Sequence, residues 1–395
     1  MKVLIISSRV PFPLRDGGAI ATFNLVKGLT DIGVEVDFAT LNTNKHHVDE
    51  QTLKSEFGFI HQLLAFDVVT DVRPLDAFLN LFSNQSYNIE RFTNIEFASK
   101  IQELLDRNQY DLIQFEGLFV AQYLQLIKTN VPCILRQHNI EYMIWERLQQ
   151  HESNPLKKWY LKLLANRLKK FEKTITPLFD AVVSITKDDE MHSRAELNAK
   201  LTNTIPAGLM TADFPLNSID LNSIYHVGSM EWMPNQDAMN WFHESIWPII
   251  AKQSPEAVFY MGGKNMPDAF LSFNDRQFNV VGEIQDLKSF TKDKSILAVP
   301  LRSGSGIRIK TIEAMISGKA VVTTKIGAQG LPLIHEVNCL IADDEQSFAA
   351  AILRLMNDES LRNRLAKNGY EMAVSEYGND SISKKWLNLY QQLKR

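Results

Sequence analysis

The sequence predicts an α/β fold made of two parallel-sheet domains, and three observations support this. The chain has 395 residues, which is long for one domain and enough for two domains with their own cores. Short apolar runs alternate with helical periods along the whole chain, as they do when helices connect parallel strands. The alternation breaks at residues 201–220, which contain Pro206, Gly208 and Pro215, and then resumes. We therefore predict a first domain over 1–205, a second over 206–378 and a last helix over 379–395.

The predicted elements follow from local patterns, with apolar runs for strands and a 3.6-residue period for helices. In the first domain the strands are residues 2–8, 34–40, 111–116, 132–138 and 181–186, and the helices are 18–32, 89–108 and 155–174. In the second domain the strands are 224–229, 258–262, 279–282, 295–300, 320–324 and 338–342. Its helices are 235–250, one ending near Gly318 and two within 344–375.

Composition excludes several classes of function. The formal net charge is −4 and the pI about 6.2, which argues against nucleic acid as a partner. Cys133 and Cys339 are far apart in apolar runs, so we expect buried free thiols of a cytoplasmic protein. Cysteine and histidine spacings predict no metal site. The sequence lacks an apolar run long enough to cross a membrane, and the run at residues 3–6 is too short for a signal peptide.

The most informative segment is residues 299–324, where a buried strand leads through a Gly/Ser loop into a helix. Backbone N–H groups at such a turn favour an anion. Arg308 and Lys310 add two mobile cations, and Glu313 follows on the same face of the helix. Cations suit a diphosphate, and a carboxylate one turn later suits the hydroxyls of a ribose. The alternative interpretation is a solvated Arg308 and an ordinary surface pair of Lys310 and Glu313.

This segment resembles the nucleotide-sugar motif of the family 4 (group 1) retaining glycosyltransferases. The matching residues are Glu313-Ala314-Met315, Gly318-Lys319-Ala320-Val321-Val322 and Gly327-Ala328-Gln329-Gly330. The resemblance implies the GT-B fold, in which two Rossmann-like domains face a central cleft and the C-terminal helix crosses back to the first domain. It also implies a nucleoside-diphosphate sugar as donor substrate, no cofactor and no metal.

By this resemblance, Arg308 and Lys310 are catalytic because they stabilise the departing diphosphate. The donor site would further include Gly228, Ser305, Gly306, Ile307 and Glu313. The chain departs from the family pattern in two places. The loop at residues 228–235 lacks the usual Arg and Lys, and Ser305 stands where many relatives have a glutamate. We expect Asn235, at the end of that loop, to cap the next helix.

In the first domain, Arg15-Asp16-Gly17-Gly18 joins the first strand to the first helix. The two glycines let the backbone approach a ligand closely, but they do not form a dinucleotide fingerprint. The resemblance places Gly17 and Gly18 in a glycine-rich loop of the donor site and Arg15 and Asp16 on the acceptor side. A plain strand-to-helix turn is the alternative.

Three residues stand at the carboxyl ends of predicted strands, where ligands of open α/β sheets bind. His138 ends one strand, and the resemblance makes it the catalytic histidine. Glu116 ends the preceding strand and is a candidate for acceptor binding or for holding His138, with a solvated strand-end carboxylate as the alternative. Glu141 opens the next helix and is assigned to the acceptor side. In the alternative interpretation, His138 and Asn139 end a strand and cap a helix, with Glu141 completing a capping box.

The helix at residues 155–173 has seven cations and one acid, together with Trp159 and Tyr160. This composition fits attachment to the inner face of the cytoplasmic membrane. Packing of the apolar stripe on the domain's own sheet is the alternative.

The sequence therefore predicts an enzyme that transfers a sugar from a nucleoside-diphosphate sugar to a saccharide acceptor, either free or lipid-linked, in polysaccharide or glycan biosynthesis. Two rival functions stay open. One is a nucleotide-sugar epimerase of the same fold, and the other is an inactive sugar-nucleotide-binding subunit, which the departure at Ser305 motivates.

Overall fold

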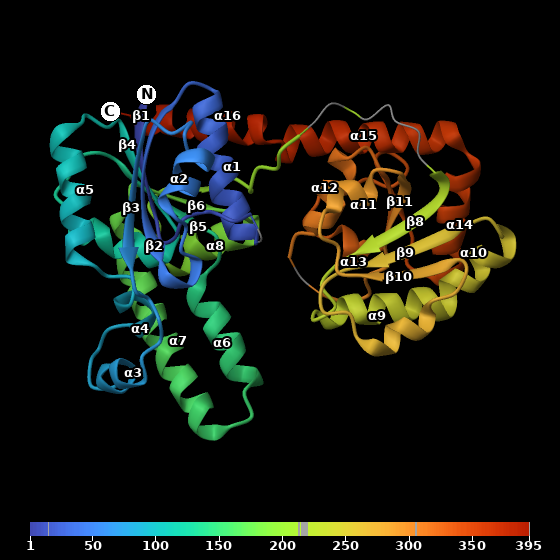
Figure 1. Cartoon of the computed structure of the whole chain (residues 1–395), viewed down its shortest axis with the longest axis horizontal. Helices are drawn as coiled ribbons and strands as arrows, with labels where there is room; N and C mark the ends of the chain where they lie inside the picture. The colour runs from blue at the N-terminus through green and yellow to red at the C-terminus, as the bar shows by residue number, and fades with distance from the viewer. Residues whose placement is uncertain (15, 212–213, 215–219, 305, 395) are drawn as a thin grey trace. The chain divides into compact units, whose positions relative to one another are not determined.

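A computed structural model describes the chain except for residues 15, 212–213, 215–219, 305 and 395. The described residues form two compact units (Figure 1). Unit 1 comprises Met1–Leu209 and Asn379–Arg395, and unit 2 comprises Met210–Gly378. The predicted residues Arg15 and Ser305 lie outside the described part of the chain.

Unit 1 is a seven-stranded parallel sheet with helices on both faces. Its strands lie in the order β3-β2-β1-β4-β5-β6-β7. The strands are β1 Lys2–Ser7, β2 Glu35–Thr43, β3 Gln62–Val68, β4 Leu112–Glu116, β5 Cys133–Gln137, β6 Ala181–Ser184 and β7 Thr202–Thr204. The helices are α1 Gly17–Asp31, α2 Glu50–Glu56, α3 Pro74–Asn80, α4 Tyr87–Glu90, α5 Ile95–Arg107, α6 Glu141–His151, α7 Pro155–Ile175, α8 Lys187–Glu196 and α16 Asn379–Leu393.

Alternation along β1 divides the core of unit 1 between the two faces of the sheet. Val3 and Ile5 face a cluster that includes α1 and α16, whereas Leu4 and Ile6 face a cluster that includes α5 and α7. Burial on both faces explains why β1 is a continuous apolar run. The C-terminal helix α16 belongs to unit 1 because Trp386 is completely buried in the first of these clusters.

Unit 2 has a six-stranded parallel sheet in the order β10-β9-β8-β11-β12-β13. The strands are β8 Asp220–Val227, β9 Val258–Gly262, β10 Phe278–Gly282, β11 Lys294–Val299, β12 Ala320–Thr323 and β13 Leu340–Ile341. The helices are α9 Met233–Trp241, α10 Trp247–Gln253, α11 Leu287–Thr291, α12 Ile309–Ile316, α13 Lys325–Ala328, α14 Glu345–Asn357 and α15 Glu359–Tyr377.

Both sheets reverse their strand order beside the first strand of the unit. The reversal lies between β1 and β4 in unit 1 and between β8 and β11 in unit 2. Loops that leave the carboxyl ends of such neighbouring strands diverge, and the crevice between them is where open α/β sheets bind ligands. The predicted fold class of two Rossmann-like domains is confirmed, and this topology fixes where a site is expected in each unit.

Three predicted elements differ from the structure. The irregular stretch at residues 201–220 begins with a strand, β7, which pairs with β6 at the sheet edge. The single helix predicted at 235–250 is divided by a π-helical turn at Phe242–Ile246, just before Pro248, which has no N–H to continue an α-helix. The helix predicted at 89–108 is two helices, α4 and α5.

Candidate functional site

A cavity of about 510 Å³ opens at the reversal point of the unit 2 sheet. Its walls come from the loop after β8, the turn after β9 and the first turn of α12. Of the residues predicted for a donor site, it contains Gly228, Ile307, Arg308, Lys310 and Glu313. The other lining residues are Val227, Ser229, Trp232, Asn235, Gly263, Lys264, Ile284, Leu287 and Ile309.

Lys310 is held in this cavity by two neutral groups. Its Nζ lies 2.9 Å from Nε2 of His226 and 2.9 Å from Oδ1 of Asn235. Nδ1 of His226 lies 2.8 Å from the carbonyl oxygen of Ala298, so this nitrogen carries the proton and donates it. Nε2 is then an acceptor, and Lys310 donates to both partners. The surface pair of Lys310 and Glu313, which was the alternative interpretation, does not form.

The surroundings of Lys310 disfavour its positive charge. Burial and the nearby charge of Arg308 lower the pKa of Lys310 to about 7. Burial and the charge of Lys310 also lower the pKa of His226 well below its ordinary value, which keeps the imidazole neutral. An anion in the cavity would restore the charge on Lys310, and this favours phosphate as a ligand.

Arg308 is buried, which contradicts the alternative of a solvated loop residue. It is the N-cap residue of α12 and is buried, and its guanidinium lies 5.3 Å from the ring centre of Trp232. The side chain also donates to the carbonyl oxygen of Gly306, whose φ of +89° turns the loop. Arg308 and the N-terminus of α12 therefore lie at the same wall of the cavity.

Two glycines let the cavity wall pack closely, Gly228 beside Lys310 and Gly263 against the backbone of Gly228. A Cβ on Gly228 would lie 2.6 Å from the side-chain nitrogen of Asn235 and 2.9 Å from Nζ of Lys310. A Cβ on Gly263 would lie 1.7 Å from the carbonyl oxygen of Gly228. Glu313 is half-buried on the next turn of α12, and burial raises its pKa.

In unit 1 the carboxyl end of β4 carries a buried, multiply bonded carboxylate. Glu116 accepts from Thr22 at 3.0 Å, from Gln114 at 2.5 Å and from Arg136 at 3.1 Å. Burial raises the pKa of Glu116, but the charge of Arg136 and the hydrogen bonds from His138 and Gln114 lower it to about 2. The fully buried Arg136 also lies 5.6 Å from the ring centre of Trp386.

His138 is partly exposed at this edge, and its Nε2 lies 3.2 Å from Oε2 of Glu116. The capping-box alternative is wrong, because Ile140 is the N-cap residue of α6 and its side chain makes no cap hydrogen bond. Instead, Glu172 of α7 accepts from the backbone N–H of Tyr142 at 3.2 Å. Burial raises the pKa of Glu141 to about 7, despite a hydrogen bond from Asn139.

Asp16 is the N-cap residue of α1 and accepts from the backbone N–H groups of Gly18 and Ala19. It also pairs with Arg9. Gly17 has open space around its Cα, whereas a Cβ on Gly18 would lie 3.0 Å from the Arg9 guanidinium. This geometry is that of a capped strand-to-helix turn beside β1, and it leaves Gly17 accessible.

Sequence reasoning missed four residues that hold these groups: His226, Trp232, Asn235 and Arg136. The prediction that Asn235 caps α9 is wrong, since Trp232 is the N-cap residue and Asn235 instead bonds Lys310 and Ser229. Position is a sequence signal for His226 alone, which lies on β8 at the reversal point, whereas Trp232 and Asn235 follow in the next loop and helix and Arg136 lies on β5.

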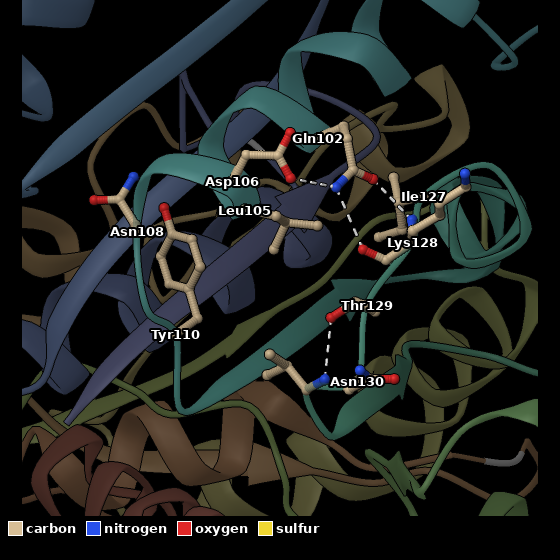
Figure 2. Close-up of a pocket in the computed structure, with 10 residues that line it drawn as sticks. Gln102, Leu105, Asp106, Asn108, Tyr110, Ile127, Lys128, Thr129 and Asn130 are labelled. Atoms are coloured by element: carbon tan, nitrogen blue, oxygen red, sulfur yellow. Dashed lines mark hydrogen bonds between the residues drawn. The ribbon is translucent and has the colours of Figure 1, made fainter.

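A second cavity of about 510 Å³ lies at the opposite, amino-terminal edge of the unit 1 sheet (Figure 2). Several of its polar groups already hold hydrogen bonds within unit 1. Gln102 donates to Asp106 at 2.8 Å and accepts from the backbone N–H of Lys128 at 2.7 Å. None of the predicted site residues that the structure describes lines it, and we assign it no role.

Comparison with known proteins agrees with the geometry. The model of the family described as Glycosyltransferase Family 4 matches residues 15–209, and that described as Glycosyl transferases group 1 matches residues 222–358. A similar sequence is an uncharacterised 44.6 kDa protein in the cps region of Klebsiella pneumoniae. It is 22% identical over 407 residues, which cover 96% of this chain and 97% of the relative.

Solved structures share the fold at low identity. TarM of S. aureus has a TM-score of 0.65 at 12% identity, with 98% of each chain covered. HepE of Anabaena, in complex with UDP, has a TM-score of 0.60 at 13% identity, covering 99% of this chain and 100% of that one. Because the two family matches follow each other along almost the whole chain, the fold and the sequence together define its class. The chain belongs to the group 1, family 4 glycosyltransferases, and it is a GT-B enzyme.

Proposed function

We propose that this glycosyltransferase uses a nucleoside-diphosphate sugar as donor and binds its diphosphate in the unit 2 cavity. The observation that carries the proposal is Lys310, a cation held by two neutral acceptors beside Arg308 and the α12 N-terminus. As the bond to the sugar breaks, negative charge grows on the leaving diphosphate, and these groups would stabilise it. UDP in the complexes of HepE and TarM supports a nucleotide donor.

Glu313 would accept hydrogen bonds from the ribose, and Gly228 would let the backbone approach the diphosphate. The acceptor would be a saccharide, free or lipid-linked, bound at the Glu116 and His138 edge of unit 1. The relative encoded in the cps region supports a role in polysaccharide biosynthesis. Retention of the anomeric configuration and a reaction without metal are parts of this proposal. Product stereochemistry by NMR and activity in a chelator would test them.

A nucleotide panel tests the donor site directly. UDP, GDP, dTDP and ADP are titrated into the wild type and into Lys310→Ala, with Lys325→Ala as a control for loss of an exposed lysine in unit 2. At 100 times its dissociation constant, the correct nucleotide should stabilise the wild type by about 2.7 kcal/mol. The Lys310 variant should lose most of this stabilisation and the control none of it.

Activity assays separate the rival functions. Incubation of the nucleotide sugar without an acceptor should leave the sugar unchanged, whereas an epimerase would convert it. Addition of saccharide acceptors should then release the nucleoside diphosphate. Nucleotide binding without transfer to any acceptor would favour the inactive subunit.

A further inference from the structure

The α3 region of unit 1 exposes an apolar stripe that a folded domain normally buries. Leu75, Phe78, Leu79 and Phe82 follow the i, i+3, i+4, i+7 spacing, which places them along one side of α3 and the turn after it. Their exposed fractions lie between 56% and 80%. The rings of Phe78 and Phe82 contact each other edge to face at 5.6 Å. We call these four residues the α3 stripe.

Helix α7 carries a matching exposed surface. Its carboxyl-terminal half packs in the core of the unit through Leu168 and Ile175, but Leu156 and Trp159 in its first turns are 79% and 59% exposed. Trp159, Lys162, Asn166 and Lys170 are all exposed and follow an i, i+3, i+7, i+11 spacing, so they form one row along the helix. We call these four residues the α7 row.

The two surfaces belong to one part of unit 1. Arg167 of α7 donates to the backbone and side-chain oxygens of Asn80 at 2.9 Å and to the carbonyl oxygen of Leu81 at 3.0 Å. These bonds fix the carboxyl end of α3 against the middle of α7. Figure 1 shows α3 and the far ends of α6 and α7 at the same end of the unit, beyond the sheet.

On α7 itself, every charged side chain that meets solvent is a cation. The acid of α7, Glu172, is completely buried at the start of α6, so the exposed surface of α7 itself carries only cations. Lys157, Lys169 and Lys173 each pair with a carboxylate. On α3, Asp76 lies off the stripe by helical spacing.

We propose that the α3 stripe and the α7 row form a docking surface for a membrane that contains anionic lipid. Leucine and aromatic side chains enter the boundary between headgroups and acyl chains, while lysines remain at the charged headgroups. The surface fits this occupant for two reasons. Its exposed apolar side chains complement the acyl-chain boundary, and the lysines of the α7 row, which contains no acid, complement the anionic headgroups. This inference is independent of the sugar-transfer proposal.

Vesicle co-sedimentation of the full chain tests the proposal. One vesicle set contains phosphatidylcholine alone, and the other also contains phosphatidylglycerol. The wild type should bind the second set, with a strong decrease as salt rises. Phe78→Ser with Phe82→Ser, and separately Lys162→Glu with Lys170→Glu, should each weaken binding at least tenfold. The expected loss is on the order of fivefold for each lysine near the lipid.

The control variant is Leu271→Ser with Val281→Ser, which removes two apolar side chains of unit 2 that are 53% and 47% exposed. It should bind vesicles as the wild type does, and all variants should keep the wild-type melting temperature and nucleotide affinity. Trp159 provides a second readout. Its emission, obtained as the difference between the wild type and Trp159→Phe, should shift to the blue when vesicles are added.

Two kinds of result would overturn the proposal. In the first, vesicle binding differs from the expectation: the wild type stays in the supernatant with anionic vesicles at low salt, or Phe78→Ser with Phe82→Ser binds them as tightly as the wild type. In the second, sedimentation velocity without lipid finds a dimer that Phe78→Ser with Phe82→Ser dissociates. The stripe would then be an interface between two copies of the chain.

Discussion

The Glu116 cluster of unit 1 and the Lys310 cavity of unit 2 occupy equivalent places in their sheets, but they treat a buried charge in opposite ways. Glu116 meets Arg136 and three further groups within 3.2 Å, which stabilise its charged form. Lys310 meets a neutral imidazole and a neutral amide, with Arg308 as the nearby charge, which disfavours its charged form.

From this difference we infer that Glu116 is part of the structural framework of unit 1, whereas Lys310 is part of a binding site in unit 2. A buried charge whose partners are all present is part of the folded structure, and removing one partner leaves the other uncompensated. A cation with only neutral acceptors gains its compensating charge from a ligand. We therefore expect changes at Glu116 to affect folding and changes at Lys310 to affect nucleotide binding.

The largest effect is expected for Glu116→Gln. The substitution leaves the fully buried Arg136 without its counter-charge, which should lower the free energy of unfolding by about 3–5 kcal/mol. Urea denaturation measures this. Glu313→Gln is the matched control, because Glu313 is half-buried and has no cationic partner within the described residues. Equal stability of the two variants would contradict the framework role.

The same pair gives a pH signature. Because the folded-state pKa of Glu116 is about 2, below its ordinary value of 4.5, its stabilisation is present above pH 4.5. The contribution is lost as the pH falls toward 2. The stability difference between the wild type and Glu116→Gln should therefore shrink over this range, and a constant difference would exclude the ionised carboxylate as its source.

Next in size is the loss of either cation of the unit 2 cavity. Lys310→Ala and Arg308→Ala should each remove a charge-assisted bond to phosphate and cost about 1.5–3 kcal/mol in transition-state stabilisation. Steady-state kinetics and nucleotide titration measure this. Lys310→Ala should leave the free energy of unfolding unchanged or raise it, since a partly buried cation whose charge is disfavoured is removed. Wild-type nucleotide affinity and turnover in both variants would contradict the site assignment.

Substitutions of His138 test whether the exposed side of the Glu116 cluster in unit 1 takes part in the reaction. If it contacts the transferred sugar, His138→Ala should lower turnover by about tenfold to a hundredfold and leave nucleotide affinity unchanged. His138→Gln can still donate to Glu116, so it separates support of that carboxylate from contact with the sugar. A lower melting temperature with normal specific activity would make His138 structural.

The smallest effect is expected for Glu313→Gln. An amide can still accept a hydrogen bond from a ribose hydroxyl, but the bond loses its charge, so nucleotide affinity should fall by about 1 kcal/mol or less. Calorimetric titration measures this. The variant should bind nucleosides and nucleotides with the same proportional loss. A loss of affinity confined to the phosphorylated forms would contradict a contact between Glu313 and the ribose.

Some features of the fold were readable from the sequence because they are local. Strands such as β1 and β11 are buried on both faces and therefore appear as continuous apolar runs. The edge strands β3 and β7 were missed because they are only partly buried and their sequences are mixed. Proline and glycine near β7 indicated a linker. Because proline is tolerated at the edge of a sheet, this signal does not exclude an edge strand.

The site was only partly readable, for a different reason. Arg308, Lys310 and Glu313 lie together in the sequence, and their pattern indicated an anion site. Their partners are distant, since Lys310 meets Asn235 from 75 residues away and His226 from 84. No local spacing encodes such a contact, and Asn235 beside a helix start resembled a cap. Those distant partners also supply the contacts that hold the two cations in place.

Proton uptake on nucleotide binding tests the central claim most directly, that Lys310 gains its compensating charge from the donor diphosphate. At pH 8 the free Lys310, with a pKa of about 7, is mostly neutral, whereas a bound diphosphate should restore its proton. Calorimetry in buffers of different ionisation enthalpy, with the nucleotide that binds, should find uptake of nearly one proton in the wild type and almost none in Lys310→Arg. Binding without uptake, or equal uptake in both proteins, would contradict the account.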